Sequence, residues 1–169
     1  MRILLKNGKV MGSHGDFESR VTLLENYGEG HVIRWVPDDT SLLPASDGGV
    51  ADPRLIMDEG IVRMCIREDI DNRTDELIAQ GFVYQSIQFK MDTEHQNTYM
   101  FSYLLNQTYP YTVKGVGENY LIFQDRNEHT TFIVSGFTAC STIIQTGWGI
   151  KESLDEMTKE EMLAWVDSR

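Results

Sequence analysis

The spacing of apolar and polar residues predicts short strands at the start of the chain. Residues 3–11 carry the clearest signal, because an Asn-Gly pair stands between two apolar runs and both central positions of a type I′ turn favour positive φ. A second candidate hairpin joins residues 21–27 to residues 31–36 across a Gly-Glu-Gly turn. Together these patterns predict a small N-terminal β-hairpin region over residues 1–36.

Residues 37–54 interrupt this pattern. Pro37, Pro44, Pro53 and a pair of glycines stand among Asp and Ser residues, a composition that cannot sustain a helix or a strand. We therefore expect a linker or an extended arm. An arm of this kind is ordered when it is held against the body of the protein or against a neighbouring subunit, because ordering an isolated segment costs conformational entropy.

From residue 55 onward, apolar residues recur near every 3.6 positions, which is typical of helices. The first predicted helix runs from Leu55 to Gly81, a glycine suited to the position after a helix C-terminus, with residues 71–74 as a candidate interruption. Residues 82–89 then alternate bulky and polar side chains, and we expect one strand with one buried face.

Further elements follow in the same region. A helix capped by Asp92 or Thr93 is predicted to run to about residue 108, followed by a hairpin over residues 111–124 and a long helix over residues 128–157. The capping-box pattern at Thr158 and Glu161 predicts a last short helix over residues 159–166. The predicted fold class is α+β: an N-terminal β-hairpin region, a Pro/Gly-rich arm, and a C-terminal helix-strand-helix-hairpin-helix body over residues 55–169.

Composition excludes several kinds of partner. The chain carries a formal net charge of −11, and we expect no direct contact with nucleic acid, since binding phosphates requires clustered Lys and Arg. The apolar run at the N-terminus is too short for a signal peptide and no run reaches the length of a membrane span, so we expect no membrane partner. Cys65 and Cys140 lie in apolar surroundings and are predicted to be buried, reduced thiols.

The sequence shows no recognisable constellation for catalysis, for a cofactor or for a metal ion. The histidines are too far apart to share a helical turn, at His14, His31, His95 and His129. Residues 68–76 resemble a calcium-binding loop, but Thr74 and Gln80 stand where such a loop needs Gly and Glu. We interpret residues 68–76 as a solvated helix junction. A small enzyme or ligand-binding protein whose site forms only in the folded structure stays open as an alternative.

Several aromatic residues are left without a chemical role. Most are expected in the core, but aromatic side chains near the ends of elements are of the type enriched at protein interfaces. Burial of these residues between chains would favour assembly, whereas aromatic residues lining an enclosed cavity would favour a ligand. The candidate interface residues are Tyr109, Tyr111, Trp148 and Trp165.

Two segments resemble an uncharacterised domain family of tailed bacteriophages. The first ends in the pattern Leu-Ile-x-x-Gly-Phe at residues 77–82, and the second contains Phe-x-x-Asp at residues 89–92, followed by a helix with a Gln in its first turn. The family occurs in tail-associated virion proteins and in the C-terminal parts of tail-fibre assembly proteins. The resemblance covers about residues 55–157 and rests on structural residues, so it implies no active site.

The lack of a chemical motif and this resemblance lead to one expectation, a non-enzymatic bacteriophage virion structural protein that forms part of the tail, the tail tip or the connector region. We expect other virion or tail proteins as partners and a homo-oligomer arranged around a symmetry axis. The expected location is the virion, after synthesis in the host cytoplasm. A tail-fibre assembly chaperone, absent from the mature particle, is the alternative within the same family.

Overall fold

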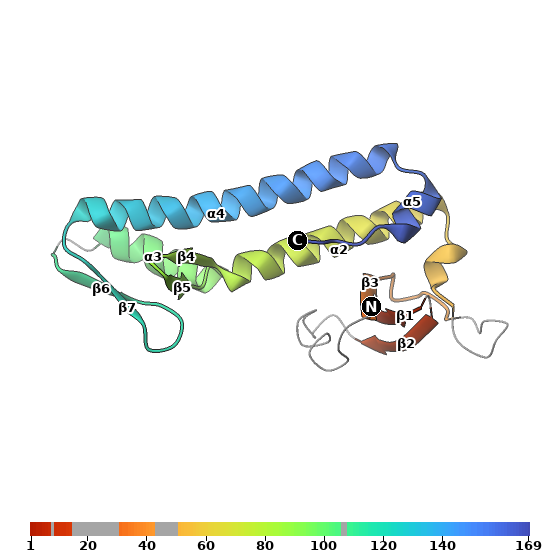
Figure 1. The fold of residues 1–169 in the computed structure, drawn as a ribbon, viewed down its shortest axis with the longest axis horizontal. Coiled ribbons are helices and arrows are strands. Elements are labelled where there is room, and N and C mark those ends of the chain that lie inside the picture. Colours follow the sequence, from red (N-terminus) through yellow and green to blue (C-terminus); the bar gives the residue numbers. More distant parts are fainter. Residues whose placement is uncertain (8, 15–30, 43–50, 106–107) are drawn as a thin grey trace. The chain divides into compact units, whose positions relative to one another are not determined.

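The computed structural model describes residues 1–7, 9–14, 31–42, 51–105 and 108–169. It shows an α+β fold with an N-terminal β-hairpin region and C-terminal helices, as predicted (Figure 1). The chain divides into two compact units, Met1–Arg73 with Gly149–Arg169, and Thr74–Trp148. Helices α2 (Glu59–Gln80) and α4 (Arg126–Ser153) each contribute residues to both units. The domain boundaries predicted after residues 36 and 54 stay predictions.

The N-terminal strands form one antiparallel sheet. Its strands are β1 (Arg2–Lys6), β2 (Lys9–His14) and β3 (His31–Trp35), in the spatial order β2-β1-β3. The central strand is the most buried, because Ile3 and Leu4 are fully covered. On one face of this sheet, Ile3 and Leu5 join Val36 in a small apolar core of the first unit.

The predicted hairpin over residues 3–11 is confirmed by the pairing of β1 with β2, and Asn7 has the positive φ of 53° that suits a tight turn. The strand predicted over residues 31–36 is also present, as β3, and it pairs with β1. The partner predicted for it at residues 21–27 lies outside the described residues.

The C-terminal part of the predicted arm is held by Arg54. This residue lies in a short 3₁₀ helix, η1 (Pro53–Leu55), and its side chain is 1% exposed. Its guanidinium donates to the Asp69 carboxylate on α2 at 2.6 Å and to the backbone oxygen of Trp35 on β3 at 2.7 Å. The Trp35 N–H in turn donates to Asp69 at 2.7 Å. One buried ion pair thus joins arm, sheet and helix within the first unit, while residues 43–50 of the arm lie outside the described residues.

The interpretation of residues 68–76 as a solvated junction is wrong at Asp69. The Asp69 side chain is 15% exposed, and its burial raises the pKa of the carboxyl, an effect that the Arg54 charge opposes. The predicted interruption at residues 71–74 is also wrong, because α2 runs through it without a break. Two charged side chains there are engaged with the C-terminal part of the chain: Asp71 pairs with Lys151, and the Arg73 guanidinium donates to the backbone oxygen of Arg169.

Helix α2 ends where predicted but begins later. Gly81 follows it with a φ of 82°, which confirms the predicted role of this glycine after the C-terminus. The predicted start at Leu55 is wrong, since Leu55 closes η1 and α2 begins at Glu59. The buried side of α2 in the first unit packs against the C-terminal elements through Val62, Ile66, Ile70, Leu154 and Met162.

The chain ends in two short elements. Helix α4 stops at Ser153, four residues before the predicted end, and a 3₁₀ turn, η2 (Leu154–Glu156), follows. Helix α5 (Lys159–Ala164) begins at the predicted capping box: Thr158 accepts from the Glu161 N–H and the Glu161 carboxylate accepts from the Thr158 N–H.

The second unit opens with a hairpin where one strand was predicted. Residues 82–89 form β4 (Phe82–Tyr84) and β5 (Ile87–Phe89), which pair in antiparallel fashion. The turn residues Gln85 and Ser86 have φ values of 47° and 66°, so both occupy the left-handed region. Neither is a glycine or an asparagine, and for that reason the turn carried no signal in the sequence.

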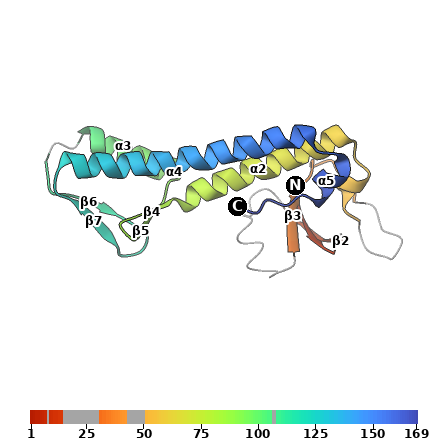
Figure 2. The ribbon, with the colours of Figure 1, turned by 45° about the horizontal axis from the view of Figure 1, so that its top comes forward.

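The remaining elements of the second unit match their predictions within a few residues. Asp92 caps α3 (Thr93–Leu105) by accepting from the His95 N–H at 3.0 Å. The predicted hairpin over residues 111–124 is confirmed as β6 (Tyr111–Lys114) and β7 (Tyr120–Phe123). Both hairpins and α3 gather around the N-terminal part of α4 (Figure 2). Their shared core is aromatic and includes Phe82, Phe89, Tyr99, Phe123 and Phe132.

Candidate functional site

The four predicted interface aromatics have different surroundings. Tyr109 and Tyr111 are half-buried beside His129 in the second unit. Trp165 is half-buried against the core of the first unit. Trp148, on α4, is 61% exposed. The structure thus brings Tyr109 and Tyr111 together and leaves Trp148 open to solvent.

His129 is a buried imidazole enclosed by aromatic rings. Its ring stacks on Phe123 at 4.6 Å and on Tyr111 at 5.3 Å between centroids. The Tyr109 hydroxyl lies 3.3 Å from Nδ1, and Ser102 Oγ lies 3.5 Å from Nε2. Burial lowers the pKa of His129, and the positive charge of Arg126 lowers it further. The sequence did not distinguish this histidine from the others.

The contact between Ser102 and His129 resembles part of a nucleophilic site, but its geometry argues against that role. A base that activates a serine accepts the hydroxyl proton across about 2.6–3.2 Å. Ser102 instead donates its proton to the backbone oxygen of Tyr99 at 2.8 Å, while its distance to His129 is 3.5 Å. The arrangement fits an imidazole that accepts from Tyr109 and directs its own N–H toward Ser102, which satisfies a core histidine without activating a nucleophile.

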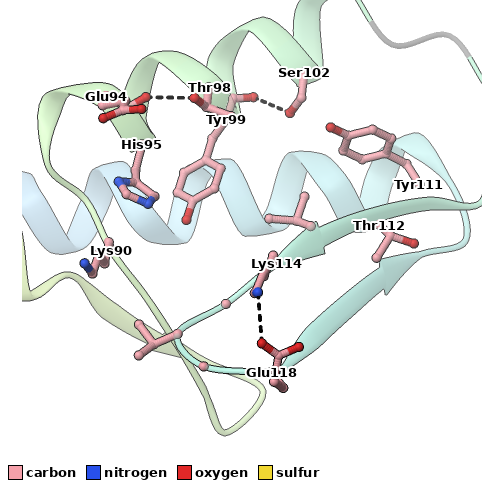
Figure 3. A pocket seen from close by; sticks show the side chains of 14 residues that line it. Lys90, Glu94, His95, Thr98, Tyr99, Ser102, Tyr111, Thr112, Lys114 and Glu118 are labelled. Atoms are coloured by element: carbon pink, nitrogen blue, oxygen red, sulfur yellow. Dashed lines mark hydrogen bonds and ion pairs between the residues drawn. The ribbon is translucent and has the colours of Figure 1, made fainter.

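A pocket of about 660 Å³ lies beside this cluster, between α3 and the β6–β7 hairpin (Figure 3). Its lining mixes charges of both signs, with Lys90 and Lys114 against Glu94 and Glu118. The two charged residues on the hairpin neutralise each other, since Lys114 pairs with Glu118 at 3.2 Å. No single charge dominates this lining, and a ligand of one sign gains little from it.

Two titratable side chains of α3, His95 and Tyr99, also line the pocket. Figure 3 shows His95 and Tyr99 directed from the helix toward the hairpin. His95 is held by Asp92 at 2.7 Å. The Tyr99 hydroxyl is buried without a hydrogen-bond partner among the described residues, and burial raises the pKa of Tyr99 to about 12. A phenol with this pKa keeps its proton at neutral pH, so it is a poor acid or base catalyst.

The part of the chain that the structure describes contains no candidate metal site. No group of three or more His, Cys, Asp or Glu side chains there is placed to hold an ion. Cys65 and Cys140 are buried and free, as predicted, and burial raises the pKa of both thiols. Neither thiol is therefore primed for reaction. The described helices also include none that is both long and apolar enough to cross a membrane.

The most unusual surface of the second unit lies on α4. Residues 129–150 contain no Asp, Glu, Lys or Arg, although such residues make up 24% of the chain. One side of this stretch packs into the core through His129, Phe132, Gly136 and Cys140. On another side, Val134, Phe137 and Trp148 are exposed by 57%, 37% and 61%. We call the side that carries residues 130, 134, 137, 141, 144 and 148 the α4 face.

The spacing within the α4 face is that of a helix-pairing seam. Its positions alternate in steps of four and three residues from 130 to 148, the pattern that places side chains along one stripe of a helix. Apolar residues at such positions normally lie against another helix. Here, several of them are open to solvent, which marks a surface suited to a protein partner.

The hydroxyl group of Thr130, on the α4 face, is already satisfied within the helix. It donates to the backbone oxygen of Arg126, four residues earlier, at 2.7 Å. Covering Thr130 in an interface consequently costs less desolvation than covering an unpaired hydroxyl would.

Comparisons of the chain with protein-family models, with curated proteins and with solved structures gave no match.

Proposed function

We propose that this protein is a non-enzymatic structural or assembly subunit, and that it works by binding other protein subunits through the α4 face. The observation that carries the proposal is the exposure of Val134, Phe137 and Trp148 on a stretch of helix without charges. Burying a large apolar side chain stabilises a complex by about 1.5–3 kcal/mol. At many interfaces a few such anchoring side chains carry most of the binding energy.

Two hydroxyl groups, of Ser102 beside His129 and of Tyr99 in the pocket, support the non-enzymatic part of this proposal. Ser102 gives its proton to a backbone oxygen, and the Tyr99 hydroxyl has a pKa near 12. Neither of these two hydroxyl groups is therefore poised as a nucleophile or a base. Tyr111 lines the pocket, and so does His95, which Asp92 holds at 2.7 Å, so a ligand there is compatible with the structure.

We propose a tailed-bacteriophage particle as the setting, as a tail, tail-tip or connector-region component. This part rests on the resemblance at residues 77–82 and 89–92. In the fold, these residues have structural duties: Gly81 ends α2, Phe82 and Phe89 enter the aromatic core, and Asp92 caps α3. Residues with structural roles of this kind specify a fold, so we expect the function to depend on the surfaces that the fold presents.

Quantitative mass spectrometry of purified particles, produced by the phage that encodes the chain, tests this setting. A structural role predicts peptides of the chain in a fixed ratio to the major tail protein. Recovery from the infected lysate together with absence from the particles would instead identify a tail-fibre assembly chaperone. A chain carrying Trp148→Glu should be lost from particles, whereas the matched variant Thr146→Glu, exposed on another side of α4, should be retained.

A further inference from the structure

We propose that the partner on the α4 face is a second copy of this chain, with the two α4 helices antiparallel. This inference rests on the proposed function and names a partner for the same face. The seam then forms three kinds of layer across a twofold axis. Trp148 of one copy meets Thr130 of the other, Phe137 meets Ser141, and Val134 meets Ile144.

The sizes of the side chains favour an antiparallel pair of helices over a parallel one. In the antiparallel pair, the two large aromatic residues meet Thr130 and Ser141, and the two aliphatic residues meet each other, so the layers are similarly filled. In a parallel pair every residue meets its own equivalent. Trp148 and Phe137 would then be crowded and Ser141 would leave a void, and both defects are costly in a packed interface. Antiparallel helices also bring their opposite dipole ends together.

Charge points to a second copy and to this surface. At a formal net charge of −11, two copies repel each other over most approaches. The α4 face is free of charge, so two copies meet there without placing like charges against each other. A strongly basic partner would instead be expected to dock where carboxylates are exposed.

The length of the α4 face limits the area that two copies can bury there, and this area limits the affinity of the dimer. From Thr130 to Trp148 the helix rises by about 27 Å. One helix pair of this length buries less than the roughly 800 Å² per partner of a standard interface. We therefore expect a dimer whose population depends on concentration in the micromolar range, on the order of 10⁻⁶ M for its dissociation constant.

Sedimentation velocity of the full chain, over a series of micromolar concentrations, tests the surface. We expect a monomer–dimer equilibrium that Trp148→Glu weakens by at least about tenfold, because the new charge must be desolvated between two helices. Thr146→Glu adds the same charge to the same helix on another side and should leave the equilibrium unchanged. Circular dichroism of both variants checks that the fold is intact. A monomer at every concentration, or an equal effect of the two variants, would overturn the inference.

Cysteine cross-linking tests the direction. Oxidation of a mixture of the Val134→Cys and Ile144→Cys chains should join one variant to the other. The Val134→Cys chain alone should not cross-link, because ten residues of helix place its two thiols about 15 Å apart along the axis in the antiparallel pair. A parallel pair would give the reverse result. The wild-type chain is the control for its buried thiols at Cys65 and Cys140.

The two proposals fail in different ways. If the purified chain stays monomeric but is present in particles and requires Trp148 to enter them, the assembly function stands and its partner is another protein. If the chain pairs as described but is absent from particles, the antiparallel pair stands and the phage setting is wrong.

Discussion

The buried ion pair between Arg54 and Asp69 should decide the stability of the first unit. The Arg54 side chain is 1% exposed and that of Asp69 15%, and their atoms approach to 2.6 Å. Replacing Arg54 with Met keeps most of the buried volume but leaves a carboxylate without its counter-charge. Breaking a buried pair in this way costs about 3–5 kcal/mol. Because the Arg54 Nε and one terminal nitrogen lack partners among the described residues, their removal offsets part of this cost, and we expect a net loss of about 3 kcal/mol.

Urea unfolding followed by circular dichroism measures this loss, and Arg67→Met is the matched control. Arg67 also pairs with a carboxylate on another segment of the same unit, Asp155 at 2.8 Å, but the two side chains are 42% and 60% exposed. Exposed pairs of this kind contribute less than about 1 kcal/mol. A loss below about 1 kcal/mol in Arg54→Met, or equal losses in the two variants, would refute the assigned role of Arg54.

The loss caused by Arg54→Met should depend on pH with a definite sign. Burial already raises the pKa of Asp69, and removing the opposing Arg54 charge raises it further. Below the unfolded-state pKa of about 4, the carboxyl is protonated in both states and has no charge to desolvate. The penalty therefore grows as the pH rises from about 4 and is complete above the folded-state pKa. The difference between wild type and variant should be larger at pH 7 than at pH 4.

Three further substitutions, one in the first unit and two in the second, test smaller points by the same unfolding assay. Gly81→Ala should destabilise by about 3 kcal/mol, because its φ is 82° and a Cβ there would lie 1.8 Å from the Phe89 backbone oxygen; Gly60→Ala, in the exposed start of α2 with nothing within 4 Å, should instead stabilise by about 0.5–1 kcal/mol. Tyr99→Phe removes a buried hydroxyl without a partner among the described residues and should leave stability unchanged or slightly raised, whereas a loss above about 1 kcal/mol would mean that the hydroxyl is hydrogen-bonded in solution.

Local signals allowed most helices and hairpins to be predicted from sequence. Gly81 ended α2, and the box at Thr158 began α5, since both effects act through neighbouring backbone groups. The hairpin within residues 82–89 was missed because Gln85 and Ser86 adopt positive φ without being glycine or asparagine. An alternating pattern of eight residues is the same for one strand as for two short strands folded together, so tertiary packing made the choice.

The contacts of charged residues could not be read from local patterns. Asp69 was assigned to a solvated junction because its neighbours in sequence are polar. Its burial depends on Arg54, which lies in a segment interpreted as a linker. For the α4 face, the sequence does contain a signal in the absence of charges from residue 129 to residue 150. The sequence alone does not show which side of the helix the aromatic core covers, so this signal could not identify the exposed side. Trp148 was therefore chosen among the four aromatic residues without that information.

The placement of charge explains how a weak interface can still be selective. A chain at −11 that exposed its charges evenly would resist every approach of a second copy. Large apolar side chains are exposed elsewhere as well, such as Leu105 on α3, but the stretch of α4 from residue 129 to residue 150 exposes Val134, Phe137 and Trp148 without any charged residue among them. Repulsion between the two negatively charged copies then disfavours most orientations of encounter by a similar amount, but it does not disfavour the orientation in which the two α4 faces meet. Specificity arises from the difference between these approaches, so a seam that binds weakly can define one orientation.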